Sequence, residues 1–192
     1  MPWDFIIRRV YMVAKKTRVI VLTGVLSGLA WILMVLEFPL FVYFPSYLKI
    51  DFSDVPAILG GIIAGPLVGI AIELVKNILH FFTMSKEGGI GEIANFFAGV
   101  GLILPIIIVV RKNEKRMLAG FIISIISMAV VANIINYFIT LPLYMQHPPA
   151  SVLWSTILAI LLPFNIAKGI IICVVTFFLY KTLKNVILKF RV

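Results

Sequence analysis

The chain has 192 residues, of which 62% are apolar and 13% charged, and it carries a formal net charge of +9. Soluble domains have about 45–50% apolar and about 25% charged residues, so this composition excludes an ordinary soluble fold. A spanning helix takes about 20 residues, so six spans use roughly 120 and leave no room for an appended soluble catalytic domain.

The first apolar run, residues 19–36, follows a basic N-terminal segment. It is longer than the apolar region of a secretory signal and no small-residue cleavage pattern follows it, so we interpret it as a retained first span. The second apolar block, residues 55–82, would be about 42 Å long as one helix, longer than a bilayer core of about 30 Å requires. The glycines that precede Pro66 predict a turn, with a new helix starting at this proline.

The last apolar block, residues 151–180, is interrupted by Pro163. We expect the final helix to begin near this proline, and residues 151–162 to form an interfacial or re-entrant piece. The sequence thus predicts a single all-α membrane domain over residues 1–192, a bundle of six transmembrane helices. The expected helices cover about residues 19–37, 54–65, 66–82, 91–110, 117–141 and 163–183.

The distribution of Lys and Arg predicts the orientation of this bundle. With six spans, both termini and the loop at residues 111–116 fall on one side, which collects 13 of the 17 Lys and Arg residues. Cytoplasmic loops carry the excess of positive charge in membrane proteins, so we expect both termini in the cytoplasm. The 13 residues are Arg8, Arg9, Lys15, Lys16, Arg18, Arg111, Lys112, Lys115, Arg116, Lys181, Lys184, Lys189 and Arg191.

Polar side chains inside the expected spans gather in their outer halves, where Asn95, Asn136, Asn165 and Lys168 lie. The inner halves hold only weakly polar side chains, whereas a channel or pump needs a polar lining through the full thickness. The pattern predicts an outward-facing cup, closed below, for a flat ligand with an apolar body and a polar edge. Lys168 either donates to that ligand or forms an ion pair with an acid from another helix.

Two other polar groups have alternative interpretations. Glu73, Lys76 and His80 share one face of the expected helix 66–82, either as a functional face or around an internal Glu73–Lys76 pair. Asp51 and Asp54 precede a helix start at Val55–Pro56, and we expect them to cap that helix.

Enzyme motifs are absent from the sequence. There is no P-loop, GxSxG or HExxH motif and no Cys/His cluster, so no catalytic residue, metal site or cofactor is expected. One enzymatic alternative is a membrane enzyme acting on lipid, with Glu73, Lys76 and His80 as its acid/base set. On the first helix, Gly24 and Gly28 form a small-xxx-small pair that either packs within the bundle or lets a partner helix approach.

Several stretches, in order along nearly the whole chain, resemble the riboflavin-specific S components, the substrate-binding subunits of the energy-coupling factor (ECF) transporters of bacteria. They are Tyr47-Leu48-Lys49-Ile50-Asp51-Phe52-Ser53-Asp54-Val55-Pro56-Ala57, Gly65-Pro66 with Lys76-Asn77, Ala94-Asn95-Phe96 with Ala98-Gly99, Asn136-Tyr137 with Leu141-Pro142 and Tyr144, and Pro163-Phe164-Asn165 with Lys168-Gly169.

The resemblance implies a six-helix protein of the bacterial plasma membrane that binds riboflavin from outside. It would dock on a membrane coupling protein driven by two ATPase subunits, and Gly24 and Gly28 occupy the places of the family's docking residues. Another vitamin remains the alternative ligand. The implied ligand-binding residues are Asn136, Asn165 and Lys168 at the polar edge of the flavin, Tyr47, Leu48, Lys49 and Phe52 in a covering segment, and Asn95.

Overall fold

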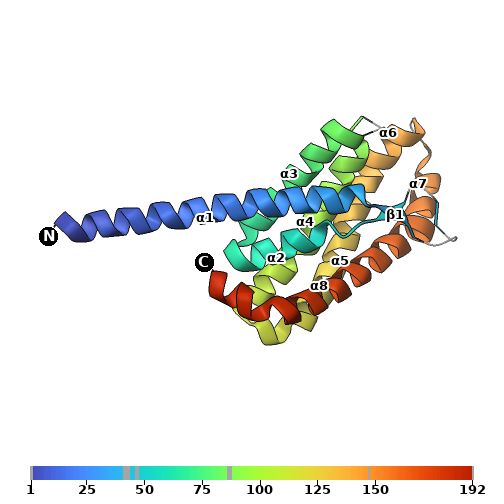
Figure 1. The fold of residues 1–192 in the computed structure, drawn as a ribbon. Coiled ribbons are helices and arrows are strands. Elements are labelled where there is room, and N and C mark those ends of the chain that lie inside the picture. Colours follow the sequence, from blue (N-terminus) through green and yellow to red (C-terminus); the bar gives the residue numbers. More distant parts are fainter. Residues whose placement is uncertain (1, 41–43, 46–47, 86–87, 147, 192) are drawn as a thin grey trace.

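The computed structural model describes residues 2–40, 44–45, 48–85, 88–146 and 148–191, and only the backbone of residues 2–12 and 14. The described chain is helical apart from the connecting loops and one pair of antiparallel strands, of two residues each, which we call the hairpin (Figure 1). Its elements are α1 (Pro2–Val35), β1 (Phe38–Pro39), β2 (Lys49–Ile50), α2 (Asp54–Ala64), α3 (Pro66–Met84), α4 (Ile90–Lys112), the 3₁₀ turn η1 (Glu114–Arg116), α5 (Met117–Ile135), the π-helical η2 (Asn136–Thr140), α6 (Leu141–Met145), α7 (Ala150–Thr156), the π-helical η3 (Ile157–Leu161) and α8 (Leu162–Phe190).

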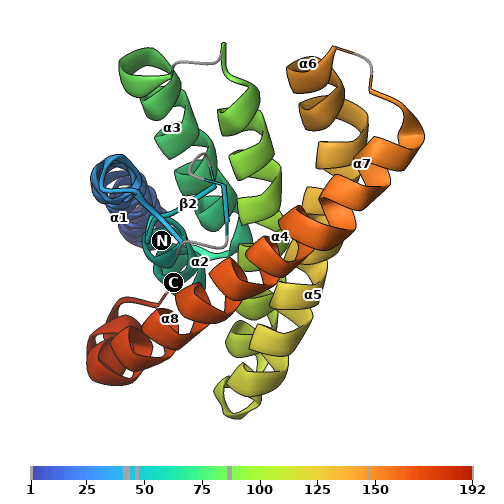
Figure 2. The same ribbon diagram turned by 90° about the vertical axis from the view of Figure 1, so that its right-hand side faces the viewer.

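The two ends of the bundle differ in what they carry. The start of α1 and the end of α8 lie at one end, which we call the terminal end, and the hairpin, α6 and α7 lie at the other, the loop end (Figure 1). Seen from the loop end, the antiparallel hairpin and the start of α2 lie among α1, α3, α4 and α8 (Figure 2). The chain therefore carries one extended segment into the interior of the bundle at its loop end.

Among the described residues, five helical runs are long and apolar enough to cross a membrane. They are Lys15–Val35, Pro66–Met84, Ile90–Lys112, Glu114–Met145 and Ala150–Phe190. The sixth apolar helix, α2, has 11 residues and is therefore about 16 Å long at 1.5 Å per residue. The first helix begins at Pro2, well before residue 19, because its basic start continues the helix beyond the bundle (Figure 1).

The short helix α2 ends at the turn that the glycines before Pro66 predict. Gly65 has a φ of 113°, a backbone conformation that favours glycine, and Pro66 is the first residue of α3. Arg111 of α4 donates to the carbonyl oxygens of Ile62 (2.8 Å) and Ile63 (3.1 Å). These bonds satisfy carbonyls that the last turn of a helix leaves without partners.

The last helical run differs from the sequence prediction, because α7, η3 and α8 form one continuous run of 41 residues. Figure 2 shows α7 and α8 as one unbroken helical ribbon. A proline in a helix lacks the N–H donor and its ring crowds the carbonyl of residue i−4. The π-helical turn η3 lies just before Leu162-Pro163, and its wider winding accommodates the proline where we expected an interruption.

Between its two ends, the bundle has an apolar core around the second half of α4. Ile103, Ile106 and Ile107 of α4 are completely buried, and they pack in one cluster with Ile62 of α2 and Ile72 of α3. The single Cys173 is also buried in this cluster. The buried charged side chains of α2, α3 and α8 lie apart from this apolar cluster, in contact with the segment before α2.

Candidate ligand-binding site

Six charged or hydroxyl side chains of the interior meet where the hairpin segment enters the bundle. They come from the segment before α2, from α2 itself, from α3 and from α8, and each residue is at most 6% exposed. We call them the charged cluster: Asp51, Ser53, Asp54, Glu73, Lys76 and Lys168.

Lys168 of α8 donates a hydrogen bond to Oδ2 of Asp51 at 3.2 Å. The other oxygen of Asp51, Oδ1, accepts the backbone N–H of Ser53 at 2.8 Å and the Ser53 hydroxyl. We expected Lys168 either to donate to the ligand or to form an ion pair with an acid from another helix. The structure shows an ion pair, and its acid, Asp51, lies in the segment before α2 rather than in a helix. A ligand-facing role for the remaining donors of this ammonium is compatible with that pair.

The pKa of the Asp51 carboxyl reflects these contacts. Burial would raise this pKa, but the ammonium groups of Lys168 and Lys76 and the hydrogen bonds from Ser53 together lower it, from 3.8 to about 2. Asp51 is therefore ionised throughout the physiological pH range, and its pair with Lys168 persists there.

Lys76 of α3 is the centre of the second part of the charged cluster. Its ammonium donates to the hydroxyl of Ser53 at 2.7 Å and to Asp54, and lies 2.9 Å from Oε2 of Glu73 as an ion pair. Gly99 of α4 lets Glu73 fit, because a Cβ at this glycine would overlap the Glu73 carboxylate. The structure thus contains the internal Glu73–Lys76 pair, extended by Asp54 and Ser53.

The expectation that Asp51 and Asp54 cap the helix was wrong. Ser53 precedes α2 and makes no side-chain capping bond, while Asp54 already lies in the helix and pairs with Lys76. The attraction of buried ammonium groups outweighs the capping bond, since a buried lysine without a partner is far more costly than an uncapped N–H.

The residues of the enzymatic alternative do not come together. His80 contacts Glu92 of α4 at 2.8 Å, whereas Lys76 contacts Glu73, Ser53 and Asp54. Among the described residues, no group of three or more His, Cys, Asp and Glu is placed to hold a metal ion. Glu73, Lys76 and His80 therefore belong to structural pairs rather than to one acid/base set.

The two asparagines implied to hold the ligand each lie next to a π-helical turn. Asn136 is the first residue of η2, and the N–H of Leu141 donates to its carbonyl, five residues back. Asn165 follows η3, in which Leu162 likewise donates to Ile157. Both turns end immediately before a Leu-Pro pair, and both asparagine residues are at least nine-tenths buried. Such π turns are frequent at functional sites.

The two π turns also pack against each other. One apolar cluster, which we call the rim cluster, joins them and includes Leu48 of the covering segment; the ring of Tyr137 lies 5.1 Å from that of Trp154. The rim cluster consists of Leu48, Tyr137, Leu141, Leu153, Ile157 and Leu161. It brings the sequences around Asn136 and Asn165 to the same part of the loop end.

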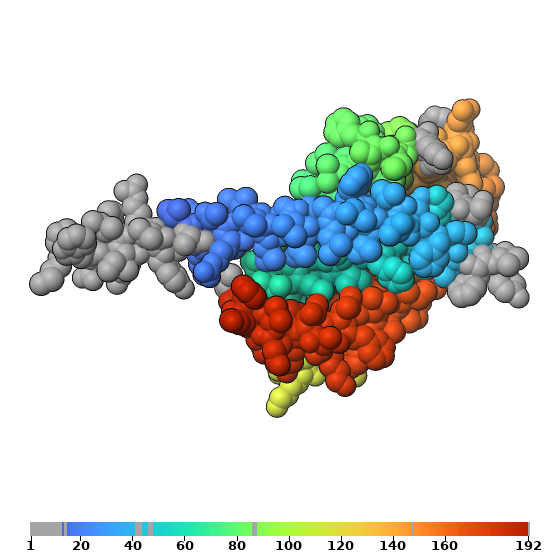
Figure 3. All heavy atoms as spheres, viewed as in Figure 1, coloured from blue at the N-terminus to red at the C-terminus, as the bar shows by residue number. Residues whose placement is uncertain are grey.

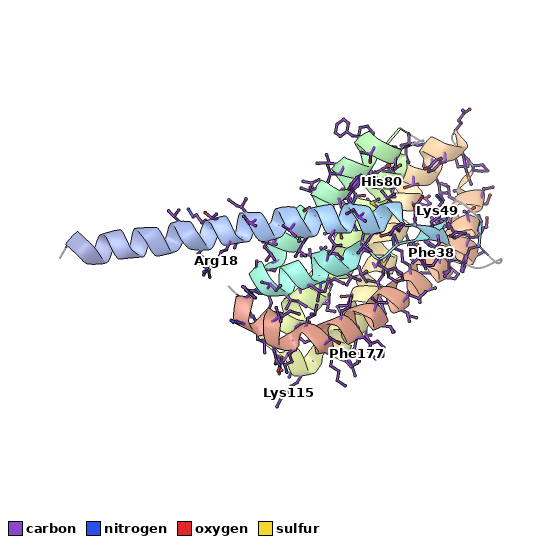
Figure 4. The ribbon with its side chains drawn as sticks, in the orientation of Figure 1. Arg18, Phe38, Lys49, His80, Lys115 and Phe177 are labelled. Atoms are coloured by element: carbon purple, nitrogen blue, oxygen red, sulfur yellow. The ribbon has the colours of Figure 1, made fainter. Side chains whose placement is uncertain are left out.

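The remaining predicted residues have varied positions. Phe52 is half-buried and its ring contacts that of Phe38, whereas Lys49 is exposed and pairs with Glu37 of the hairpin. Figure 4 shows Lys49, Phe38 and His80 near the loop end. Asn95 is half-buried, and its Oδ1 is buried without a hydrogen-bond partner among the described residues. Tyr47 lies outside the described residues.

Gly24 and Gly28 lie on an open face of α1. A Cβ added at either glycine would have no atom of other parts of the chain within 4 Å, so neither is needed for packing within the described bundle. Figure 3 shows α1 uncovered along one side of the molecule.

Two grooves of about 420 Å³ lie between α5 and the helical run of α8. Their linings are largely apolar, with Phe121, Ile125 and Cys173 in one and Ile125, Asn133 and Ile166 in the other. Neither contains a residue of the charged cluster, Asn136 or Asn165. We place the candidate site at the loop end, because buried amides and ammonium groups are the features that recognise a polar ligand edge.

Sequence reasoning did not find two features of this site. No local pattern in the sequence identifies Asp51 as the acid partner of Lys168, since the two residues are 117 positions apart along the chain. The π turns had no specific signal either: Leu-Pro follows an apolar helical stretch at Pro142 and Pro163, but also at Pro105, where α4 contains no π turn.

Comparisons with known proteins agree with these observations. Residues 18–180 match the sequence model of the family described as "ECF transporter, substrate-specific component". The chain is 40% identical over 178 residues to the riboflavin transporter FmnP of Bacillus subtilis (strain 168), covering 88% of this chain and 93% of the relative. It is 37% identical over 177 residues to the riboflavin transporter RibU of Staphylococcus aureus (strain TCH60), covering 89% and 93%.

A solved structure gives the same result. The structure described as "Structure and mechanism of the S component of a bacterial ECF transporter" superposes with a TM-score of 0.76 at 37% sequence identity. The superposition covers 88% of this chain and 97% of that one, so the similarity extends over most of this chain.

Proposed function

The chain belongs to the family of substrate-specific components of ECF transporters, and from this premise we propose that it binds riboflavin at the loop end of the bundle. It is a multi-pass membrane protein of a transport system, not an enzyme. The observation that carries the proposal is the burial of Asn136, Asn165 and Lys168 at the loop end, in a chain 37–40% identical to two riboflavin transporters.

The proposed chemistry of recognition follows from the donor and acceptor groups. A flavin has an apolar benzenoid end and a polar end with carbonyl oxygens and ring nitrogens. The amide of an asparagine both donates and accepts, and the ammonium of Lys168 donates only. These groups suit the polar end, while the rim cluster and Phe52 offer apolar surface to the other, with the segment around Leu48 as the cover.

We also propose six spans, with α2 as a short second span. Figure 1 places the start of α1 and the end of α8 at the same end, which an even number of crossings requires. The terminal end carries 13 of the 17 Lys and Arg residues, so the positive-inside rule supports cytoplasmic termini. The cup at the loop end then faces outward.

The energy for transport must come from partners, because this sequence has no nucleotide-binding motif. The proposed partners are a membrane coupling protein and two ATPase subunits. The open face of α1 around Gly24 and Gly28 supports helix docking there, since small residues let two helix backbones approach closely in a membrane.

The first experiment is an absorption spectrum of the protein purified in detergent. Because riboflavin is yellow, a tight site is expected to retain a flavin band at near one-to-one stoichiometry, or to quench added riboflavin fluorescence. A colourless protein that does neither would overturn the riboflavin proposal; thiamine and a purine would then be tested as alternative ligands.

A second experiment separates binding from docking. In Gly24→Leu and Gly28→Leu, the added Cβ meets no atom from other parts of this chain, so riboflavin binding by the purified protein is expected to stay unchanged. Uptake by cells that express the full transporter is expected to fall at least tenfold. Val130→Leu is the matched control, a larger side chain on the exposed face of α5. Normal uptake by both glycine variants would rule out docking at this face.

A further inference from the structure

Asp51 is the only described residue that connects the covering segment to Lys168 by an ion pair. Its two oxygens have separate tasks: Oδ1 accepts from Ser53, two residues along the chain, and Oδ2 accepts from Lys168 at 3.2 Å. Asp51 is 3% exposed and Lys168 is 6% exposed, so water does not compete for this contact.

The ammonium of Lys168 needs such a partner to have a defined direction. A lysine carries its charge on a flexible four-carbon stem with three rotatable donors, so the stem alone does not fix where those donors point. The Asp51 carboxylate takes one donor and holds the ammonium in place. The other two donors then point in directions set by that contact.

Asp51 is itself held from two sides. The backbone N–H of Ser53 fixes the carboxylate at the end of the covering segment, and the Ser53 hydroxyl accepts a hydrogen bond from Lys76 of α3 at 2.7 Å. The position of the Lys168 ammonium therefore depends on a chain of contacts that runs from α3 through the covering segment to α8. This chain of contacts is buried along its whole length.

We propose that Asp51 is a positioning residue that directs the Lys168 ammonium toward a carbonyl oxygen of the flavin. This inference rests on the proposed function, and it adds a residue that does not itself touch the ligand. It predicts that the loss of Asp51 removes the recognition of one carbonyl group, as the loss of Lys168 does, rather than weakening all contacts evenly.

Asp51→Asn isolates this role. The asparagine keeps the oxygen that accepts from Ser53, so the turn before α2 is preserved, but it replaces Oδ2 with an amide NH₂ that cannot accept from Lys168. Asp51→Glu keeps the charge and shifts it by one methylene group, and serves if the asparagine variant does not fold.

The experiment measures dissociation constants for riboflavin, for 2-thioriboflavin and 4-thioriboflavin, and for roseoflavin. Each thio analogue replaces one carbonyl oxygen by sulfur, a weaker acceptor, whereas roseoflavin changes only the benzenoid end. We expect the wild type to prefer riboflavin over one thio analogue by roughly 10- to 100-fold, the range for a hydrogen bond from a charged group. In Asp51→Asn and in Lys168→Met this preference is expected to vanish, with the preference between riboflavin and roseoflavin unchanged.

The double variant Asp51→Asn/Lys168→Met is expected to bind riboflavin no more weakly than Lys168→Met alone, because both changes remove the same contact. Glu92→Gln is the matched control: it removes a buried acid that contacts His80 and has no contact with Lys76 or Lys168, and should keep the preference. A preference that survives in Asp51→Asn, or in Asp51→Glu if only that variant folds, would overturn the inference. If the wild type itself does not bind riboflavin, the proposed function fails instead.

Discussion

The loop end and the middle of this bundle are built from different interactions. At the loop end, lysines and acids are buried in contact, two helices contain π turns, and an extended segment enters the interior. In the middle, Ile103, Ile106 and Ile107 of α4 are completely buried in an apolar cluster. Buried charges are costly even when paired, so their confinement to one end indicates that this end has a function beyond packing.

The same comparison bears on transport. A polar ligand held at the loop end meets an apolar core below it, and among the described residues of that core only hydroxyl groups such as those of Ser124 and Thr176 offer polar atoms. The bundle therefore lacks a continuous polar path through the described core.

The largest effect is expected from Lys76→Met, which leaves Asp54 and Glu73 buried without their shared ammonium group. Removing one partner of a buried ion pair costs about 3–5 kcal/mol. Thermal unfolding in detergent measures this loss. The control is Lys49→Met, which breaks the exposed pair with Glu37 and should change the melting temperature little. Equal melting temperatures for both variants would mean that the charged cluster does not stabilise the loop end.

Asn136→Ala and Asn165→Ala are expected to weaken riboflavin binding while the fold persists. Each removes a buried amide that we propose bonds the ligand, and an unsatisfied partner costs about 1–3 kcal/mol, or roughly 5- to 150-fold in affinity. Titration of riboflavin fluorescence measures the change. Ser124→Ala is the matched control and should bind normally, because Ser124 of α5 is a buried polar residue whose hydroxyl has no hydrogen-bond partner among the described residues. Unchanged affinity in both asparagine variants would move the ligand away from the π turns.

A smaller effect is expected from Pro163→Ala. Alanine restores the N–H donor and removes the ring, so the π turn η3 can convert to α-helix. This conversion would shift the residues of α7 by one position along the helix and rotate them by about 100° relative to α8. Leu153 and Ile157 would then turn away from the rim cluster, and we expect riboflavin affinity to fall by about 1 kcal/mol, a typical effect for a single substitution.

Pro105→Ala is the control for this change, because Pro105 lies inside α4 without a π turn in the same helix. It should leave riboflavin affinity unaltered. Equal affinities for the two proline variants would show that the π turns do not shape the site.

The smallest effect is expected when riboflavin affinity is measured at different pH values between 5 and 8. The pKa of Asp51 is lowered to about 2 in the folded protein, against an ordinary value of 3.8, so its stabilising contribution is complete above the ordinary value. It is lost only as the pH falls from about 4 toward 2. Riboflavin affinity measured across pH 5–8 should therefore not change through Asp51, and a decline within that range would assign the titration to another group.

Local signals in the sequence were sufficient for much of the fold. The glycines before Pro66 marked the turn between α2 and α3, because backbone conformation at glycine and proline is a property of the residues themselves. The apolar runs marked the five long helices, because hydrophobic length is also read along the chain. The same approach expected a break at Pro163, where the structure continues the helix through a π turn.

The sequence by itself indicated a helical membrane protein with amides and lysines inside its expected spans, among them Lys76, Asn136, Asn165 and Lys168. Only the tertiary structure decided which acid meets which lysine: Asp51 pairs with Lys168 and Asp54 with Lys76. Several pairings satisfy the same composition, and the pairing depends on how the helices pack. Contacts between residues far apart along the chain leave no periodic or local signal, which is why the positioning of Lys168 became visible only in three dimensions.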